Sequence, residues 1–384
     1  MIYLDHNATT PVDPAVAEKM AWFLRERFGN PSSLYPIGRE AKELMNEARE
    51  RVAKALGADR GEIFFTGSGT ESDNFAIFGT FDAAPDRNEF VTSAIEHPAV
   101  IESAKALEKR GIKVTYVPVD RYGTIDLDHL RSALTPKTGL VSVMHANNEI
   151  GTIQPVAEVA RIAREKGIPV HTDAVQSFGK IDVDARRLGV DFLTVSAHKI
   201  YGPKGVGALY IRRGSTICPF VHGGHQERGL RAGTENTAGI IGFGEAARVM
   251  EEKGKKERAR IEKLAERLKK GIEQKIPGAK FNGHPENRVG NTLNFAFPGL
   301  EAEAILLALA TKEIYVSTGS ACSEESEEVS HVLRAIGLRP EIARSSIRMS
   351  LGRSNAEADI EVVLKELPEI IAKLRAISAF HPEG

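Results

Sequence analysis

The sequence has little cysteine and no marked excess of charge of either sign. Cys218 and Cys322 are the only cysteines among 384 residues, too few for a disulfide framework, so a reducing, cytosolic setting is the simplest interpretation. Lys and Arg number 51 against 52 for Asp and Glu, a formal net charge of −1. This balance argues against direct binding of nucleic acid or of an anionic membrane surface.

Long hydrophobic runs and internal repeats are also missing. No apolar run is long enough to cross a bilayer, and the first residues show no basic region followed by an apolar stretch, so neither a membrane span nor a signal peptide is expected. The composition, 42% hydrophobic and 27% charged, is typical of a soluble globular protein. The length exceeds that of one ordinary domain and suffices for a large core.

Short apolar segments alternate with helical patterns through the first two thirds of the chain. Strands are predicted at 62–66, 89–93, 113–117, 139–144, 170–172, 192–196 and 207–211. Helices are predicted between most of them, for example over 71–78, 98–109 and 156–166. This alternation predicts an α/β fold with a mainly parallel, seven-stranded sheet covered by helices on both faces. In such sheets, ligands bind beyond the carboxyl ends of the strands.

The pattern changes after a long charged helix predicted over 244–275. A strand at 291–297, an apolar helix at 301–310 and a strand at 347–351 follow. These elements indicate a second, smaller α+β domain. We expect a large domain over 16–254 and a small domain made of 1–15 and 255–384.

Two polar segments at predicted strand ends combine an amine with an acid. Lys199 follows the strand at 192–196, and Asp173 follows the strand at 170–172. Enzymes that use pyridoxal phosphate need a lysine to link the aldehyde and an acid to pair with the ring nitrogen. Taken alone, Lys199 could equally be a solvated charge, and Asp173 a helix cap or a buried structural carboxylate.

Several neighbouring residues could complete such a site. Gly69 and Thr70, in a glycine-rich turn that opens a helix, could bind phosphate through backbone N–H groups, and Ser196 and His198 could donate to the same phosphate. Other polar residues at strand ends could contact the ring: His97, Asn148 and Gln176. The alternatives are a tight strand-to-helix turn for Gly69, a core histidine for His97 and a turn for Asn148.

At this point the chain resembles a known family. It is similar to the cysteine desulfurases of the NifS/IscS type, which are fold-type I pyridoxal phosphate enzymes related to class-V aminotransferases. Ordered matches run nearly from end to end: Tyr3–Thr10, 28–33, 70–74, 96–97, 147–151, 173–176, 196–205, 229–234, 319–322 and 345–353. One departure is visible, because Gly69 stands where members commonly carry alanine; the backbone amide is retained, so no loss is expected.

The resemblance implies roles for particular residues. Lys199 would link the cofactor and take the α-proton, Arg348 would hold the substrate carboxylate, and Cys322 would take the sulfur as a persulfide. His97 is implied as a third catalytic residue, and Asn148 as a contact to cofactor or substrate. The residues implied to bind pyridoxal phosphate are Gly69, Thr70, His97, Asn148, Asp173, Gln176, Ser196, His198, Lys199 and Thr234.

The resemblance also implies partners. Thr234 would reach the phosphate of a second subunit, so a homodimer is expected, and L-cysteine would be the substrate. The sulfur would pass to a scaffold for iron–sulfur clusters or to another acceptor, such as a tRNA-thiolation protein. Whether Cys322 also ligates a nascent cluster through its persulfide stays open, as do the acceptor's identity and activity on selenocysteine.

The surroundings of Cys322 argue against an activated thiol at rest. Four glutamates lie within six residues of it: Glu324, Glu325, Glu327 and Glu328. Negative charge disfavours a thiolate, so we expect Cys322 to rest as a thiol on a mobile loop at about 317–331 and to be activated near His97 or the bound substrate. The acidic loop could instead be a solvated face or steer a basic acceptor. Cys218, in an apolar context, is predicted to be structural.

Other functions were weighed against this one. Within pyridoxal phosphate chemistry, an aminotransferase is disfavoured because it has no use for a nucleophilic thiol, while a selenocysteine lyase stays an alternative. A metal site made of His97, His171, Asp173 and His198 lacks tight ligand spacing. A non-catalytic scaffold would be expected to lack Lys199 or Cys322, and both are present.

Overall fold

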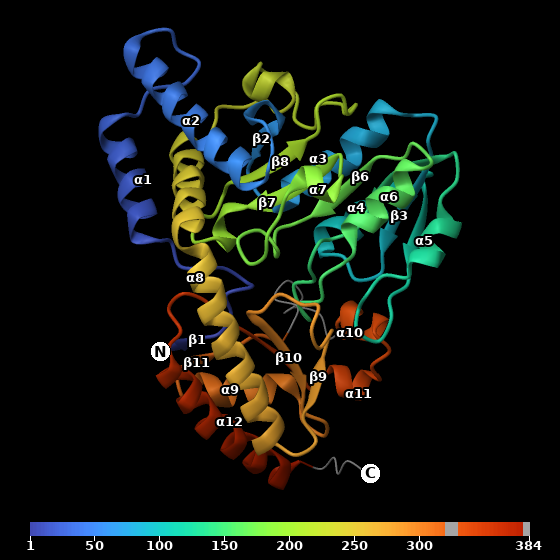
Figure 1. The fold of residues 1–384 in the computed structure, drawn as a ribbon, viewed down its shortest axis with the longest axis vertical. Helices are drawn as coiled ribbons and strands as arrows, with labels where there is room; N and C mark the ends of the chain where they lie inside the picture. Colours follow the sequence, from blue (N-terminus) through green and yellow to red (C-terminus); the bar gives the residue numbers. More distant parts are fainter. Residues whose placement is uncertain (319–328, 379–384) are drawn as a thin grey trace.

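The computed structural model describes residues 1–318 and 329–378, and its upper part in Figure 1 is built on one seven-stranded sheet. The spatial order is β2-β8-β7-β6-β5-β3-β4. Only β8 runs antiparallel to its neighbours, so the predicted mainly parallel sheet is confirmed. The strands are β2 (Ile63–Thr66), β3 (Glu89–Ser93), β4 (Lys113–Val117), β5 (Thr138–Ser142), β6 (Val170–Asp173), β7 (Phe192–Ser196) and β8 (Gly207–Ile211).

Apart from the edge strand β4, which is only partly buried, the strands of the sheet are buried on both faces. Successive side chains point to opposite faces, so Phe64 joins one hydrophobic cluster and Phe65 the other. Helices cover the faces between the strands: α3 (Gly69–Ala83), α4 (Pro98–Lys109), α5 (Leu127–Ala133), α6 (Val156–Arg164) and α7 (Ala185–Leu188). The carboxyl ends of the parallel strands therefore lie along one edge, facing the lower part of the molecule (Figure 1).

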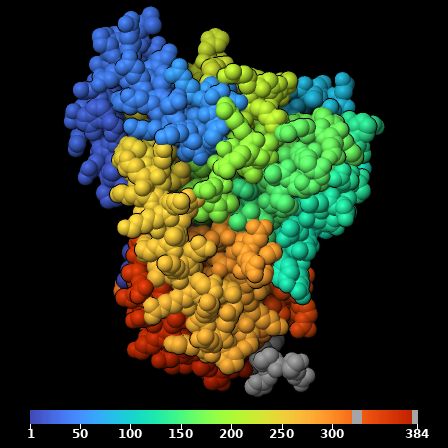
Figure 2. Space-filling view, viewed as in Figure 1, coloured from blue at the N-terminus to red at the C-terminus, as the bar shows by residue number. Residues whose placement is uncertain are grey.

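Three long helices lie against the edge of this unit. They are α1 (Pro14–Glu26), α2 (Pro36–Ala55) and α8 (Thr237–Lys275), and the sequence analysis predicted only part of the last. A Cβ on Gly244 would lie 2.4 Å from the Ala48 Cα, so glycine is what permits α8 to pack this closely on α2. Figure 2 shows α8 running down the visible face from the upper, blue and green part to the lower, orange and red part. Within the described residues, no helix has the length and apolar character to cross a membrane.

The lower unit contains a three-stranded antiparallel sheet of order β12-β10-β9. Its strands are β9 (Lys280–Asn282), β10 (Thr292–Ala296) and β12 (Ser346–Ser350), and its helices are α9 (Ala302–Ala310), α10 (His331–Ala335), α11 (Pro340–Ala343) and α12 (Glu357–Ile377). The N-terminal β1 (Ile2–Tyr3) pairs with β11 (Ile314–Tyr315). This unit has its own hydrophobic cluster, formed by residues from 264–371 together with Leu4. The domain boundaries at 15/16 and 254/255 stay a prediction.

Candidate active site

The parallel strands bring the predicted site residues to one edge of the large sheet. Asp173 ends β6, Ser196 ends β7, and His97 and Asn148 lie in the loops that follow β3 and β5. Lys199 lies in the short 3-10 helix η2 (Ala197–Lys199), directly after β7. The topology places these side chains together because parallel strands all end at the same edge.

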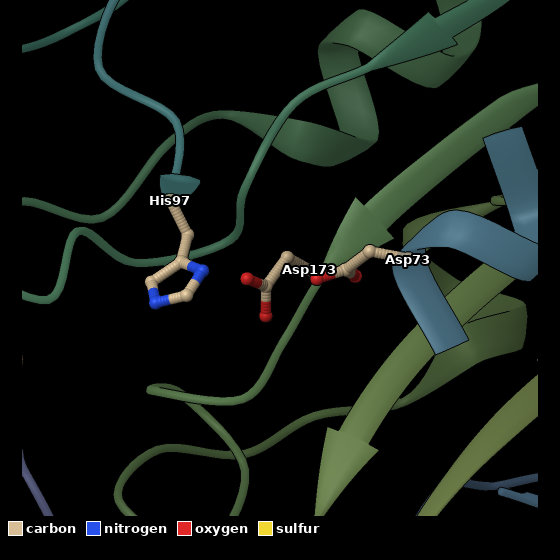
Figure 3. Close-up of side chains that lie close together, drawn as sticks. All are labelled: Asp73, His97 and Asp173. Carbon is tan, nitrogen blue, oxygen red and sulfur yellow. The ribbon is translucent and has the colours of Figure 1, made fainter. Parts of the chain in front are cut away.

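Two buried carboxylates and one imidazole form a close group in this place (Figure 3). One potential ligand atom each from Asp73, His97 and Asp173 lies within 4.8 Å of the other two. Burial raises the pKa of Asp173 to about 7, and the neighbouring Asp73 charge adds to that rise. Burial likewise raises the pKa of Asp73 to about 8. Both carboxyl groups are therefore held close to the point between the neutral and charged forms.

His97 caps α4 and faces Asp173 (Figure 3). Its Nδ1 accepts the Ala99 N–H at 3.1 Å, so this nitrogen carries no proton and Nε2 carries the ring hydrogen. Burial, followed by the charges of Lys199 and His331, lowers the pKa of His97 to about 4. The ring is neutral and its orientation is fixed by the helix start.

Lys199 is directed at the N-terminal segment. Its Nζ donates to the carbonyl oxygens of Asn7 at 2.5 Å and Ala8 at 2.7 Å. Two residues on, Tyr201 has a left-handed φ of 67°, a conformation that a residue with a Cβ adopts at a cost. The same N-terminal segment holds it there, because the Tyr201 N–H donates to Thr10 Oγ1 at 2.9 Å.

Gln176 and Arg348 also meet the N-terminal segment. Gln176 Nε2 donates to the Asn7 carbonyl at 2.9 Å. Arg348, buried on β12, pairs with Asp5 Oδ1 at 2.7 Å and donates to the Asn148 carbonyl at 3.0 Å. The predicted carboxylate-binding arginine thus already holds one internal carboxylate, and its five N–H donors allow a second to bind.

The predicted phosphate end forms where β2 turns into α3. The Ser68 side chain caps the helix by accepting from Glu71 N, while the described residues provide no acceptor for the N–H groups of Gly69 and Thr70. A Cβ on Gly69 would lie 3.7 Å from the Ser196 Cβ, so Ser196 is adjacent to these free amides. His198 Nδ1 bonds Thr9 Oγ1 at 3.1 Å. The structure therefore places an anion-binding helix start beside Ser196.

Some predicted residues are not brought into this group. Thr234 is exposed in the loop after η3 (Gln226–Gly229), and the described residues give it no hydrogen bond to a candidate site residue. Cys322, its four neighbouring glutamates and most of the expected loop at 317–331 lie outside the described residues. Cys218 lies beside α3, where its N–H donates to the Gly79 carbonyl at 2.9 Å, and its structural role stays a prediction.

The alternative metal set does not form as proposed. His171 is fully buried and hydrogen-bonded at both nitrogens, to Ser142 Oγ at 2.8 Å and Thr194 Oγ1 at 3.0 Å. It is a satisfied core histidine. In the part of the chain that is described, the potential ligand group is Asp73, His97 and Asp173, without His171 or His198.

The sequence reasoning missed three sets of residues that the structure places at the site. Asp73 and Glu96 are buried carboxylates, Lys180 is a second lysine next to Gln176, and the segment Asp5–Thr10 touches the candidates Asn148, Gln176, His198, Lys199 and Arg348. The matched segments Tyr3–Thr10, 70–74 and 96–97 contain the N-terminal residues, Asp73 and Glu96, but the sequence analysis assigned these residues no role.

The donors and acceptors left over fit pyridoxal phosphate. Within the described residues, Asp173 accepts from Val175 N at 2.8 Å and has no cation at ion-pair distance, and Asp73 Oδ1 is buried without a hydrogen-bond partner. A buried carboxylate in this state is suited to a protonated ring nitrogen. The free amides at Gly69 and Thr70 suit a phosphate, and Lys199 supplies the amine.

Comparison with known proteins assigns this fold and site to a class. The family model described as "Aminotransferase class-V" matches residues 2–363. The chain therefore belongs to the class-V aminotransferase family.

Relatives that match this chain along nearly their whole length are cysteine desulfurases, so the chain belongs with them inside that family. "Cysteine desulfurase IscS" of Clostridium botulinum (strain Hall) is 50% identical over 380 residues, which is 98% of this chain and 96% of the relative. The IscS protein of Methanosarcina thermophila is 49% identical over 383 residues, 100% of this chain and 95% of the relative. A solved "NIFS-LIKE PROTEIN" superposes with a TM-score of 0.91 at 42% identity, covering 97% of this chain and 100% of that one. The predicted family, enzyme class and cofactor are confirmed.

Proposed function

We propose that this enzyme removes sulfur from L-cysteine, forms L-alanine and carries the sulfur as a persulfide on Cys322. The observation that carries the proposal is the meeting of Lys199, Asp173 and His97 at one sheet edge, in a chain about half identical to cysteine desulfurases. Further support comes from the free amides at Gly69 and Thr70, the adjacent Ser196 and the buried Arg348.

We assign the residues the following roles. Asp173 would pair with the ring nitrogen, Gln176 would donate to the phenolic oxygen, and His97 would contact the ring. Asn148 contacts cofactor or substrate. Gly69, Thr70, Ser196 and His198 would bind the phosphate, and Thr234 of a second subunit would contact the same phosphate in a homodimer.

We propose two domains, a large one over 16–254 and a small one made of 1–15 and 255–384. The separate hydrophobic clusters support this division.

The reaction uses these side chains in order. When bound, pyridoxal phosphate supplies an electron sink for the substrate's α-carbon. Lys199 Nζ accepts the α-proton, Asp173 keeps its charge toward the ring nitrogen, and Arg348 holds the substrate carboxylate in place. Neutral His97 presents its Nε2–H as a hydrogen-bond donor toward the reacting groups. The Cys322 Sγ attacks the substrate sulfur, so a sulfur–sulfur bond forms as the carbon–sulfur bond breaks, and the remaining carbon skeleton takes up a proton to become alanine.

The sulfur then leaves the enzyme. We propose an acceptor such as an iron–sulfur scaffold protein, in keeping with the name of the IscS relatives, and tRNA thiolation as an alternative destination. We propose a cytoplasmic location, which the low cysteine content supports. We also propose that Cys322 binds a transient iron–sulfur cluster through its persulfide.

The test is a purified protein loaded with pyridoxal phosphate. We expect a visible absorption band that is lost in Lys199→Ala, and equal amounts of alanine and sulfide from cysteine and a thiol reductant. Cys322→Ala should keep the absorption band but form no persulfide and release no sulfide. The matched control Cys218→Ala should keep the band and still form persulfide and sulfide. A protein that takes up no pyridoxal phosphate would overturn the proposal.

A further inference from the structure

Asn7 has no assigned role in the reaction, yet it forms hydrogen bonds with several of the candidate site residues. Its carbonyl accepts from Lys199 Nζ at 2.5 Å and Gln176 Nε2 at 2.9 Å. Its side-chain Nδ2 donates to the Asn148 carbonyl at 3.1 Å and to Thr292 Oγ1 at 2.9 Å. Asn7 is fully buried, so the direction in which its amide points is fixed by its protein partners, which also include Asn291 Nδ2 donating to Asn7 Oδ1 at 3.2 Å.

Lys180 forms a hydrogen bond with the oxygen of the Asn7 side-chain amide. Its Nζ donates to Asn7 Oδ1 at 2.7 Å and to Gln176 Oε1 at 2.5 Å. Both partners are amide oxygens, and the described residues give Lys180 no carboxylate at ion-pair distance. Lys180 and Lys199 line one cavity of about 140 Å³ between the upper and lower units.

A lysine in this position decides which end of each amide faces it. The ammonium has donors only, so it can donate to an amide oxygen but cannot form a hydrogen bond with an amide NH₂. With Gln176 Oε1 held by Lys180, the Gln176 Nε2 must point away, toward the Asn7 carbonyl. With Asn7 Oδ1 held, the Asn7 Nδ2 must point to the Asn148 carbonyl.

The two hydrogen bonds from Lys180 do not require the lysine to be charged, although only the ammonium form, which has no lone pair, excludes an amide NH₂ altogether. Burial, followed by the charges of Lys199 and Arg348, lowers the pKa of Lys180 well below its usual value. A neutral amine keeps two N–H groups, one for each amide oxygen. The other titratable or charged groups that face Lys180 or share its cavity are His6, His198, Tyr201, Glu257, Arg258, Glu262, Arg288 and Arg353.

We propose that Lys180 is a positioning residue that presents the Gln176 N–H as a donor toward the cofactor. The inference rests on the proposed function, because Gln176 is the proposed partner of the phenolic oxygen. If the amide of Gln176 could flip, its oxygen would face that oxygen and repel it. Lys180 removes this alternative before any ligand arrives.

A double-mutant cycle tests the coupling. Apoprotein with Lys180→Met, Gln176→Leu or both is titrated with pyridoxal phosphate, and the dissociation constant and the position of the visible band are measured. Each single variant should weaken binding about tenfold, the scale of one lost hydrogen bond to a polar group. The double variant should match Gln176→Leu alone, with the same band position, because Lys180 acts through Gln176. A double variant weakened about 100-fold, the product of the two, would overturn the proposal.

Two further variants separate positioning from a general loss of structure. Lys180→Arg keeps donors toward both amide oxygens, so it should recover the wild-type band; Lys256→Met, an exposed lysine on α8, should change nothing. If Lys180→Met does not fold, Lys180→Gln replaces it in the cycle, and additive effects there count equally against the proposal. Wild-type protein that binds no pyridoxal phosphate would reject the proposed function, whereas normal wild-type binding with additive variants rejects only the role of Lys180.

Discussion

The two sides of the candidate site handle buried charge in different ways. On the lysine side, Lys180 and Lys199 donate to amide and carbonyl oxygens, and Arg348 is paired with Asp5. On the carboxylate side, a carboxylate oxygen of Asp73 lies within 4.8 Å of a carboxylate oxygen of Asp173. Asp73 Oδ1 has no hydrogen-bond partner among the described residues. The lysine side supplies acceptors for its own cations, while the carboxylate side is short of a donor.

This difference explains why the carboxylate side is the one open to a cationic ring. Burial without a cation raises the pKa of Asp73, Asp173 and Glu96 to about 8, 7 and 8. A protonated ring nitrogen next to Asp173 would supply the missing charge and hold Asp173 ionised. On the lysine side, the fold already supplies oxygen acceptors for Lys180 and Lys199 and a carboxylate for Arg348.

The largest effect should come from removing the acceptor for that cation. Asp173→Asn keeps the shape but loses the charge, so the affinity for pyridoxal phosphate should fall more than about 100-fold, the scale for breaking a buried charge pair. Asp73→Asn should change affinity less than about tenfold, since Asp73 is held mostly neutral at pH 7. Titration of the apoproteins measures both. Equal losses in the two variants would erase the distinction between the carboxylates.

On the lysine side, the strongest test is to break the ion pair between Arg348 and Asp5. Asp5→Asn leaves the buried Arg348 without its internal carboxylate, so the free energy of unfolding should fall by about 2–4 kcal/mol. Urea unfolding of the apoprotein measures this loss. A matched exposed pair, broken in Asp182→Asn beside Arg258, should cost less than about 1 kcal/mol. If both variants lost the same, the Asp5 pair would be no more than a surface contact.

Glu96 tests the carboxylate side through pH. Its pKa in the folded protein, about 8, lies above the ordinary 4.5, mainly because of burial, so the folded state binds the proton more tightly. The stability that this gives is fully present below pH 4.5 and is lost as pH rises through 8. Glu96→Gln mimics the protonated form, so its advantage over wild type should grow by about 1–3 kcal/mol between pH 6 and pH 9. A pH-independent difference in apoprotein unfolding would contradict this.

The sequence predicted the sheet well because each strand is short, apolar and bounded by turn residues. The seven predicted strands match the observed ones within about two residues, the usual uncertainty at element ends. The helices α1, α2 and α12 were missed, as was the start of α8 at Thr237, where Asn236 provides the cap. Their amphipathic patterns are clear only once the surfaces they cover are known.

The site was predicted where chemistry depends on residues at strand ends, and missed where it depends on distant contacts. Lys199, Asp173 and His97 follow parallel strands, so topology brings them together. Asn7 and Asp5 reach the site because β1 pairs with β11, more than 300 residues away in the chain, and no local pattern reports that pairing. Asp73 lies inside α3, where a buried carboxylate has no sequence signature of its own.

The smallest effect is expected at the phosphate end, between the two sides. A Cβ on Gly69 would lie 3.0 Å from Val175 Cγ2 and 3.7 Å from the Ser196 Cβ. One methyl group must move by a few tenths of an ångström, while the Gly69 N–H stays in place to bind phosphate. Alanine also favours the first turn of α3, by up to about 1 kcal/mol over glycine. Gly69→Ala should therefore leave the affinity for pyridoxal phosphate within about threefold and keep or raise the unfolding temperature. Loss of binding in this variant would mean that the anion site depends on the freedom of the glycine rather than on its amide.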